Sequence, residues 1–327
     1  MVSAGITLSE SLRLTGEITK APRIKKAMKD AYAEISKGEQ LHRGFLKNEA
    51  LFPAFFIYML RFGEETGSLE AALKKMEVYF EKQGRLLDKI KSSLTYPVVV
   101  FLVSIIVMAA LLTYIVPGFA DTLEDLGGDL PAATRILLSV SAFVRENLIY
   151  MVFFAAAGTV FMGRYLKSEK GSERMDVLKF RMPVLRTVFR HSELSGFCRN
   201  MGIMVGSGFN IIRALEVCAE ISGNILFRRQ ILDSAALVKN GGEVCRSFSA
   251  AGIDDRLFIS LVKTGEDTGS MEFMFEKAAE HYEREVENLL ERYLRLLEPA
   301  VIVVMAVVIG GVIISVMLPI MSIMDSI

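Results

Sequence analysis

The sequence predicts an all-α membrane protein, in which two repeated cytoplasmic antiparallel helical-bundle domains are combined with three transmembrane helices. Three observations predict this class. Long runs of the chain carry no charge, and two regions repeat one another at a nearly constant offset. The charged regions show the helical spacing of apolar residues, and no run shows sustained strand alternation.

The composition requires charged and apolar residues to be segregated along the chain. Hydrophobic residues make up 52% of the 327 residues, yet 23% are charged, so uncharged stretches are expected in lipid and charged stretches in water. The formal net charge is zero, which gives no electrostatic case for binding nucleic acid. The chain has three cysteines, Cys198, Cys218 and Cys245. Because their number is odd and no Cys-x-x-Cys pair occurs, we expect buried thiols in a reducing compartment rather than a disulfide framework.

Three uncharged runs are expected to cross the membrane. Residues 97–117 contain no ionisable side chain except Tyr114, and residues 299–321 contain none. A helix of this length rises roughly 30 Å, which is the thickness of the hydrocarbon core. The remaining run, residues 147–163, is shorter, but residues 137–144 ahead of it are also apolar. Prolines mark both ends of the two outer spans, at Pro97 and Pro117 and at Pro299 and Pro319.

The basic residues beside the spans predict their orientation, because lysine and arginine are enriched on the cytoplasmic side. Basic residues precede the first span and follow the second, whereas the loop between them is mainly acidic. Residues 1–96 are therefore expected to form a first cytoplasmic domain, and residues 164–298 a linker and a second one. The loop of residues 118–146 and the tail of residues 322–327 should lie in the periplasm.

An internal repeat relates the two cytoplasmic regions. The segment MVSAGI from Met1 matches MVGSGF from Met204 at an offset of 203 residues. The segment GEETGSLE from Gly63 matches GEDTGSME from Gly265 at an offset of 202, and both proline pairs keep that second offset. One single-residue gap therefore aligns two units, each a helical domain followed by a membrane span.

Apolar residues in each unit recur at helical spacing. Leu69, Leu73, Met76 and Phe80 follow this pattern, and residues 254–261 and 278–297 are similar. The opposite faces are charged and are expected to contact protein partners. The residues of these charged faces are Lys74, Lys75, Glu77, Glu81 and Lys82 in the first unit and Glu280, Glu283, Arg284 and Glu287 in the second.

A glycine-rich acidic turn occurs once in each unit and has three alternative interpretations. Glycine-rich loops can surround a phosphate, but a Walker A loop needs Lys followed by Ser or Thr after its last glycine, and these are absent. Neighbouring carboxylates could instead ligate a divalent cation. The favoured interpretation is punctuation between helices, in which glycine ends one helix and serine caps the next. The turn residues are Gly63, Glu64, Glu65, Thr66, Gly67 and Ser68, and Gly265, Glu266, Asp267, Thr268, Gly269 and Ser270.

No pattern in the sequence predicts catalysis, so we expect a scaffold rather than an enzyme, with no catalytic, cofactor or metal site. His42, His191 and His281 lie far apart without ligand spacing, and no nucleophile elbow or zinc signature occurs. A small membrane transporter or channel subunit is the alternative, because repeats also occur in transporters. Against it, the repeat is mostly cytoplasmic and the spans carry no charged side chain that could relay a proton.

The doubled turn, the proline at the start of each following span and the segment FCRNMGIMVGSG from Phe197 resemble the inner-membrane platform proteins of type II secretion and type IV pilus machines, the GspF/PilC family. The resemblance covers essentially the whole chain. It implies a hub in the bacterial inner membrane that contacts a cytoplasmic hexameric assembly ATPase, other inner-membrane assembly proteins and pilin or pseudopilin subunits. It also implies a homo-oligomer, with nucleotide hydrolysis in the ATPase, and leaves secretion, piliation and competence open.

The first unit differs from the second at its beginning. Residues 191–203 precede the second copy of the repeat and are expected to form an amphipathic helix, whose counterpart would fall before residue 1. The family usually carries a further N-terminal stretch. We therefore expect a misassigned start or a fragment.

Overall fold

The computed structural model describes residues 1–115 and 183–325, with a few isolated positions between 117 and 158. Over these residues the chain is helical and contains no strand. The predicted second span and the loop before it lie almost entirely outside the described residues. The chain divides into two compact units, which differ from the two units of the repeat. The first compact unit is Met1–Leu87 with Asp176–Val286, and the second is Asp88–Met175 with Glu287–Ile327.

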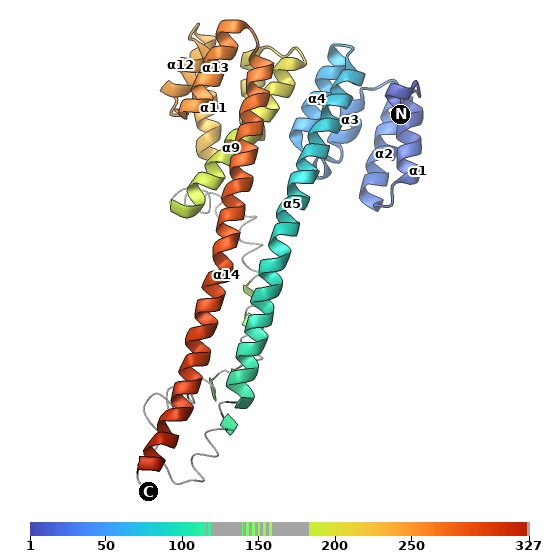
Figure 1. Ribbon diagram of the computed structural model, residues 1–327. Helices are drawn as coiled ribbons and strands as arrows, with labels where there is room; N and C mark the ends of the chain where they lie inside the picture. The colour runs from blue at the N-terminus through green and yellow to red at the C-terminus, as the bar shows by residue number, and fades with distance from the viewer. Residues whose placement is uncertain are drawn as a thin grey trace. The chain divides into compact units, whose positions relative to one another are not determined.

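Among the described residues, five α-helices lie in the first part of the chain and six in the second, with three shorter helical turns (Figure 1). The first set is α1 (Leu8–Ile18), α2 (Pro22–Ser36), α3 (Leu41–Leu46), α4 (Ala54–Glu65) and α5 (Leu69–Ala110), with the 3-10 turns η1 (Val2–Ala4) and η2 (Glu49–Leu51) and the π-helical turn η3 (Leu111–Ile115). The second set is α9 (Pro183–Gly206), α10 (Ile211–Ile221), α11 (Ile225–Lys239), α12 (Val244–Ala250), α13 (Arg256–Thr268) and α14 (Met271–Asp325).

Local sequence explains where several of these helices begin. Asn210 and Asn224 accept hydrogen bonds from the backbone N–H groups of Ile212 (2.9 Å) and Phe227 (2.8 Å), so they cap α10 and α11. Such bonds satisfy N–H groups that the first turn of a helix leaves unpaired. Asp255 caps α13 by accepting from the N–H groups of Leu257 and Phe258. The helix expected over residues 254–261 therefore begins at Arg256, after its capping aspartate.

The helices of the two sets begin at matching intervals. The starts of α1, α2 and α3 lie 203 residues before those of α10, α11 and α12. The starts of α4 and α5 lie 202 residues before those of α13 and α14. The single-residue gap in the repeat therefore falls between α3 and α4. Only the second set has a helix, α9, ahead of its first repeated member.

The core of the first unit is one continuous cluster with buried side chains from both sets. Met59, Leu60 and Met76 of the first set are almost fully buried, as are Met201 and Phe258 of the second. Burial of such side chains is worth about 1.5–3 kcal/mol each before losses of entropy. The sets also meet where the rings of Phe62 and Phe209 stack, with their centroids 3.7 Å apart.

Two helices carry the apolar runs expected to cross a membrane. Lys91–Ala110 of α5 and Met271–Gly311 within α14 are long and apolar enough by length and composition. Pro97 and Pro299 do not begin new helices, because α5 and α14 continue through them. The boundary expected at residue 97 is thus a change in composition within one helix, and the same holds at residue 299.

Candidate functional site: paired glutamate turns and a charged groove

Each acidic turn directs its first carboxylate to the N-terminus of a short helix. Glu64 accepts hydrogen bonds from the backbone N–H groups of Leu41 and His42, the latter at 3.1 Å, and its carboxylate also lies 2.7 Å from Nδ1 of His42. These N–H groups belong to the first turn of α3 and have no partner within that helix. A carboxylate at this position also interacts favourably with the helix dipole. Glu64 therefore fastens the turn after α4 to the start of α3.

The second copy repeats this arrangement. Glu266 accepts from the N–H groups of Val244 at 2.6 Å and Cys245 at 3.1 Å, which open α12. Burial, followed by the hydrogen bond and charge of Glu266, raises the pKa of the Cys245 thiol. The thiol is therefore kept protonated, and its role is packing rather than reactivity.

The glycines of the turns meet two different requirements. Gly67 and Gly269 have φ angles of +69° and +67°, a left-handed conformation that favours glycine. Gly63 and Gly265 are helical but closely approached: a Cβ would lie 3.0 Å from Leu69 Cα at Gly63 and 3.1 Å from Met271 Cα at Gly265. Both features suit a tight turn between two packed helices.

The serines lie at the expected boundary, and their hydroxyls bind neighbouring threonines. The carbonyls of Ser68 and Ser270 accept the first hydrogen bonds of the following helices, from Ala72 and Met274. The Ser68 hydroxyl lies 2.6 Å from that of Thr66, and the Ser270 hydroxyl 2.5 Å from that of Thr268. Glu65 pairs with Arg61 at 2.7 Å. The first carboxylate and the two hydroxyls of each turn thus have structural partners.

No group of three or more His, Cys, Asp or Glu residues with metal-binding proximity occurs in the part of the chain that the structure describes. The three histidines do not converge. His42 contacts Glu64, whereas His191 and His281 lie near the ring of Tyr282. Burial raises the pKa of the Cys198 and Cys218 thiols well above its usual value.

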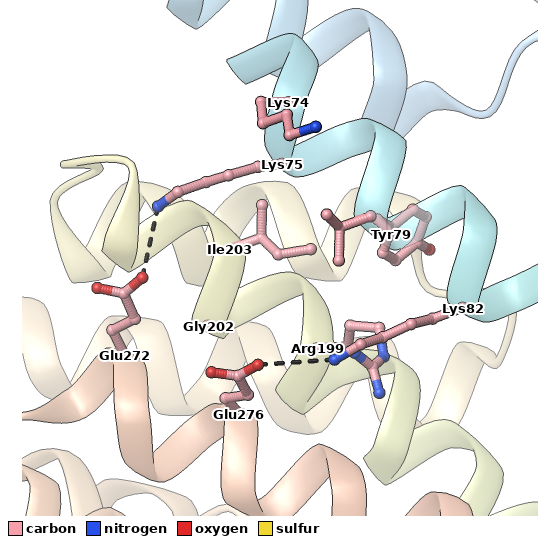
Figure 2. A pocket seen from close by; sticks show the side chains of 10 residues that line it. Lys74, Lys75, Tyr79, Lys82, Arg199, Gly202, Ile203, Glu272 and Glu276 are labelled. Atoms are coloured by element: carbon pink, nitrogen blue, oxygen red, sulfur yellow. Dashed lines mark hydrogen bonds and ion pairs between the residues drawn. The ribbon is translucent and has the colours of Figure 1, made fainter. Parts of the chain in front are cut away.

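A charged groove lies between α5, α9 and α14 in the first unit, with a volume of about 200 Å³ (Figure 2). Lys75 and Lys82 of α5 reach across it toward Glu272 and Glu276 of α14, with N–O distances of 3.4 and 3.7 Å. The groove is lined by Lys74, Lys75, Val78, Tyr79, Lys82, Arg199, Gly202, Ile203, Glu272 and Glu276.

The charged face expected on α5 is therefore divided between two directions. Lys75 and Lys82 face the groove. Lys74 also borders the groove, but its ammonium group pairs with Glu77 at 2.9 Å. Glu81 pairs with Arg85 at 2.6 Å, and all four of these paired side chains are more than half exposed. We call Lys74, Glu77 and Glu81 the outer face of α5.

The sequence did not predict the buried ion pair at the edge of the groove. The Arg199 side chain is only 7% exposed, and its Nε donates to Glu283 at 2.6 Å. Glu283, which the sequence predicts on a charged face that contacts partners, pairs with Arg199 instead. The available signal was Arg199 itself, because a charge within an apolar helical segment requires a partner.

Comparison with known proteins gives the family. The family model described as "Type II secretion system (T2SS), protein F" matches residues 1–117 and 197–319. The chain is 30% identical to the type IV pilus assembly protein PilC of Thermus thermophilus, over 100% of this chain and 80% of the relative. It is 29% identical to the protein of that name in Pseudomonas aeruginosa, over 98% of this chain and 86% of the relative. It is 27% identical to type II secretion system protein F of Pseudomonas aeruginosa, over 98% of this chain and 80% of the relative.

Proposed function

Since the chain belongs to the family of type II secretion system protein F, we propose that it is an inner-membrane platform of a type II secretion or type IV pilus assembly machine. In this role it couples a cytoplasmic hexameric ATPase to the polymerisation of pilin or pseudopilin subunits. Its partners are that ATPase, other inner-membrane assembly proteins, the pilin-like subunits and further copies of itself.

The observation that carries this proposal is the continuity of α5 and α14. Each begins at a glutamate turn among charged residues and continues without interruption into an apolar run. Apolar side chains in these runs are widely exposed, including Phe101 at 56%, Ile106 at 66% and Val307 at 69%. Such exposure suits lipid or neighbouring membrane helices rather than water. A platform needs this connection between cytoplasmic contacts and the bilayer.

Genetic complementation tests the proposal. Deleting the gene from its own host should abolish surface filaments or secretion of the exported protein while ATPase and pilin levels remain normal. Expression of the full chain should restore them. Normal filaments and secretion in the deletion strain would contradict a platform role.

We propose an N-in, C-out topology with three spans, in which residues 97–117, 147–163 and 299–321 cross the membrane. A cysteine-specific, membrane-impermeant label should modify a single cysteine placed at Asp125 in intact spheroplasts. It should modify one placed at Ser172 only after the membrane is opened. Equal labelling of both positions in intact spheroplasts would contradict this topology.

The outer face of α5 is proposed as a contact for the ATPase. The triple variant Lys74→Glu/Glu77→Lys/Glu81→Lys should weaken ATPase binding about fivefold or more at low salt, because charged rims govern association and its salt dependence. The measurement is a titration of the detergent-purified chain with the matching ATPase. The wild-type affinity should itself decrease as salt is raised.

A matched control separates this surface from a general effect of charge. The variant Glu10→Lys/Arg13→Glu/Glu17→Lys changes the net charge by the same amount, since each variant converts two acids to lysines and one base to glutamate. Its three residues also form exposed ion pairs, on α1. Equal weakening by the two triple variants would contradict a specific contact at α5.

A further inference from the structure

A second groove lies between α5 and α14, entirely within the second unit, where both helices change from charged to apolar. Its volume is about 410 Å³. Four residues come from each helix, and one pair, Ser93 and Arg295, is related by the repeat offset of 202. They are Ser93, Tyr96, Pro97 and Val100 from α5, and Glu291, Leu294, Arg295 and Val301 from α14.

The groove is polar at one end and apolar at the other. Ser93 and Glu291 lie at its polar end, and Val100 and Val301 at its apolar end. The seven residue-to-residue steps from Ser93 to Val100 rise about 10 Å along a helix. With the chain in the membrane as proposed above, this distance runs from the headgroup layer to the first part of the hydrocarbon. The groove is therefore amphipathic in the same direction as a phospholipid.

Two prolines each leave a backbone carbonyl without its helical donor beside this groove. A proline has no N–H, so it cannot bond to the carbonyl four residues before it. Pro97 frees the carbonyl of Ser93, and Pro299 frees that of Arg295. Ser93 and Arg295 are separated by the repeat offset of 202 and both line the groove. Each of these carbonyls can therefore accept a hydrogen bond from a ligand that has N–H groups.

The charged side chains of the groove have opposite signs. An Arg295 guanidinium nitrogen lies 3.5 Å from the Glu291 carboxylate, and the two side chains are 82% and 42% exposed. A weak, exposed ion pair of this kind contributes little and is readily exchanged for other partners. Arg295 can donate to a phosphate, and Glu291 can accept from an ammonium group.

We propose that this groove binds one phospholipid with a primary-amine headgroup, of the phosphatidylethanolamine type. The ammonium group donates to the Ser93 and Arg295 carbonyls and to Glu291, the phosphate accepts from the Arg295 guanidinium, and one acyl chain lies along Val100 and Val301. A choline headgroup has no N–H to donate, and a glycerol headgroup has no positive charge for Glu291. The inference rests on the proposed membrane location.

Native mass spectrometry of the full chain tests this inference. The protein is released from nanodiscs that contain equal amounts of phosphatidylethanolamine, phosphatidylglycerol and phosphatidylcholine, and the retained lipids are counted. We expect phosphatidylethanolamine to be retained at least fivefold over each of the others. Arg295→Gln should remove this preference, and so should Pro97→Ala, which restores a donor to the Ser93 carbonyl.

Arg292→Gln is the matched control, because Arg292 lies one turn or less from Arg295 and is exposed but does not line the groove. It should keep the preference. Equal retention of the three lipids, preference for phosphatidylglycerol or phosphatidylcholine, or equal loss in Arg292→Gln and Arg295→Gln would overturn the inference. Carbonate extraction separates it from the proposed function: a chain that stays in the membrane without lipid preference contradicts only the lipid site.

Discussion

Glu266→Ala is expected to lower the free energy of unfolding by about 3 kcal/mol, because two N–H groups at the start of α12 lose their acceptor. Both belong to buried residues: Val244 is 8% exposed and Cys245 is 5% exposed. The helix would also lose a negative charge at its N-terminus. The measurement is denaturant unfolding of the full chain in detergent micelles, followed by circular dichroism.

Glu266→Gln provides the matched comparison, since an amide oxygen can still accept one of these bonds although the charge is lost. It should cost about 1 kcal/mol. Glu64→Ala should also be destabilising, because Glu64 holds the N-terminus of α3 in the same way. If Glu266→Ala left the unfolding transition unchanged, the hydrogen bonds at the turn would not have the structural role described above.

Arg199→Leu is expected to cost about 3 kcal/mol, because it leaves the Glu283 carboxylate without its partner in a partly buried position. The double variant Arg199→Leu/Glu283→Leu should recover most of this loss, since a buried ion pair can be replaced by apolar side chains at little cost. The same unfolding measurement applies to both variants. A double variant as unstable as the single one would show that the loss comes from packing rather than from the unpaired charge.

Arg190→Leu is the control on the same helix. Arg190 lies 4.0 Å from Asp254, and the two side chains are 42% and 77% exposed. Exposed pairs of this kind contribute about 0–1 kcal/mol, so this variant should change stability by less than about 1 kcal/mol. A loss as large as that of Arg199→Leu would contradict the assignment of the effect to burial.

Local patterns predicted the helical class. The spacing of Leu69, Leu73, Met76 and Phe80 identified part of α5, because this spacing depends on neighbours in the sequence. Gly67 and Gly269 of the predicted turns follow α4 and α13. The match of the protein F family model and the relatives' names confirmed the resemblance inferred from the repeated turns. That the two halves form equivalent bundles and that three spans exist stay predictions.

Partners distant in the sequence could not be predicted in the same way. Helical periodicity shows which side chains share a face, but not which helix lies opposite, so it did not separate Lys75 and Lys82 from Lys74. The role of Glu64 depends on N–H groups 22 and 23 residues earlier in the chain. The sequence predicts Pro97 and Pro299 as boundaries of the spans, but a long helix can continue through a proline with the loss of a backbone hydrogen bond.

Because α5 and α14 continue through Pro97 and Pro299, the direction of each side chain around the helix axis depends on its number of residues from the start of that helix. Gly63 and Pro97 are separated by 34 residues, and so are Gly265 and Pro299. In a continuous helix each residue turns the chain by about 100°. Removing one residue between the turn and the proline would therefore rotate every later side chain by that angle, whereas removing seven would nearly restore its phase. A loop can absorb a change of length, whereas a continuous helix converts it into a change of phase.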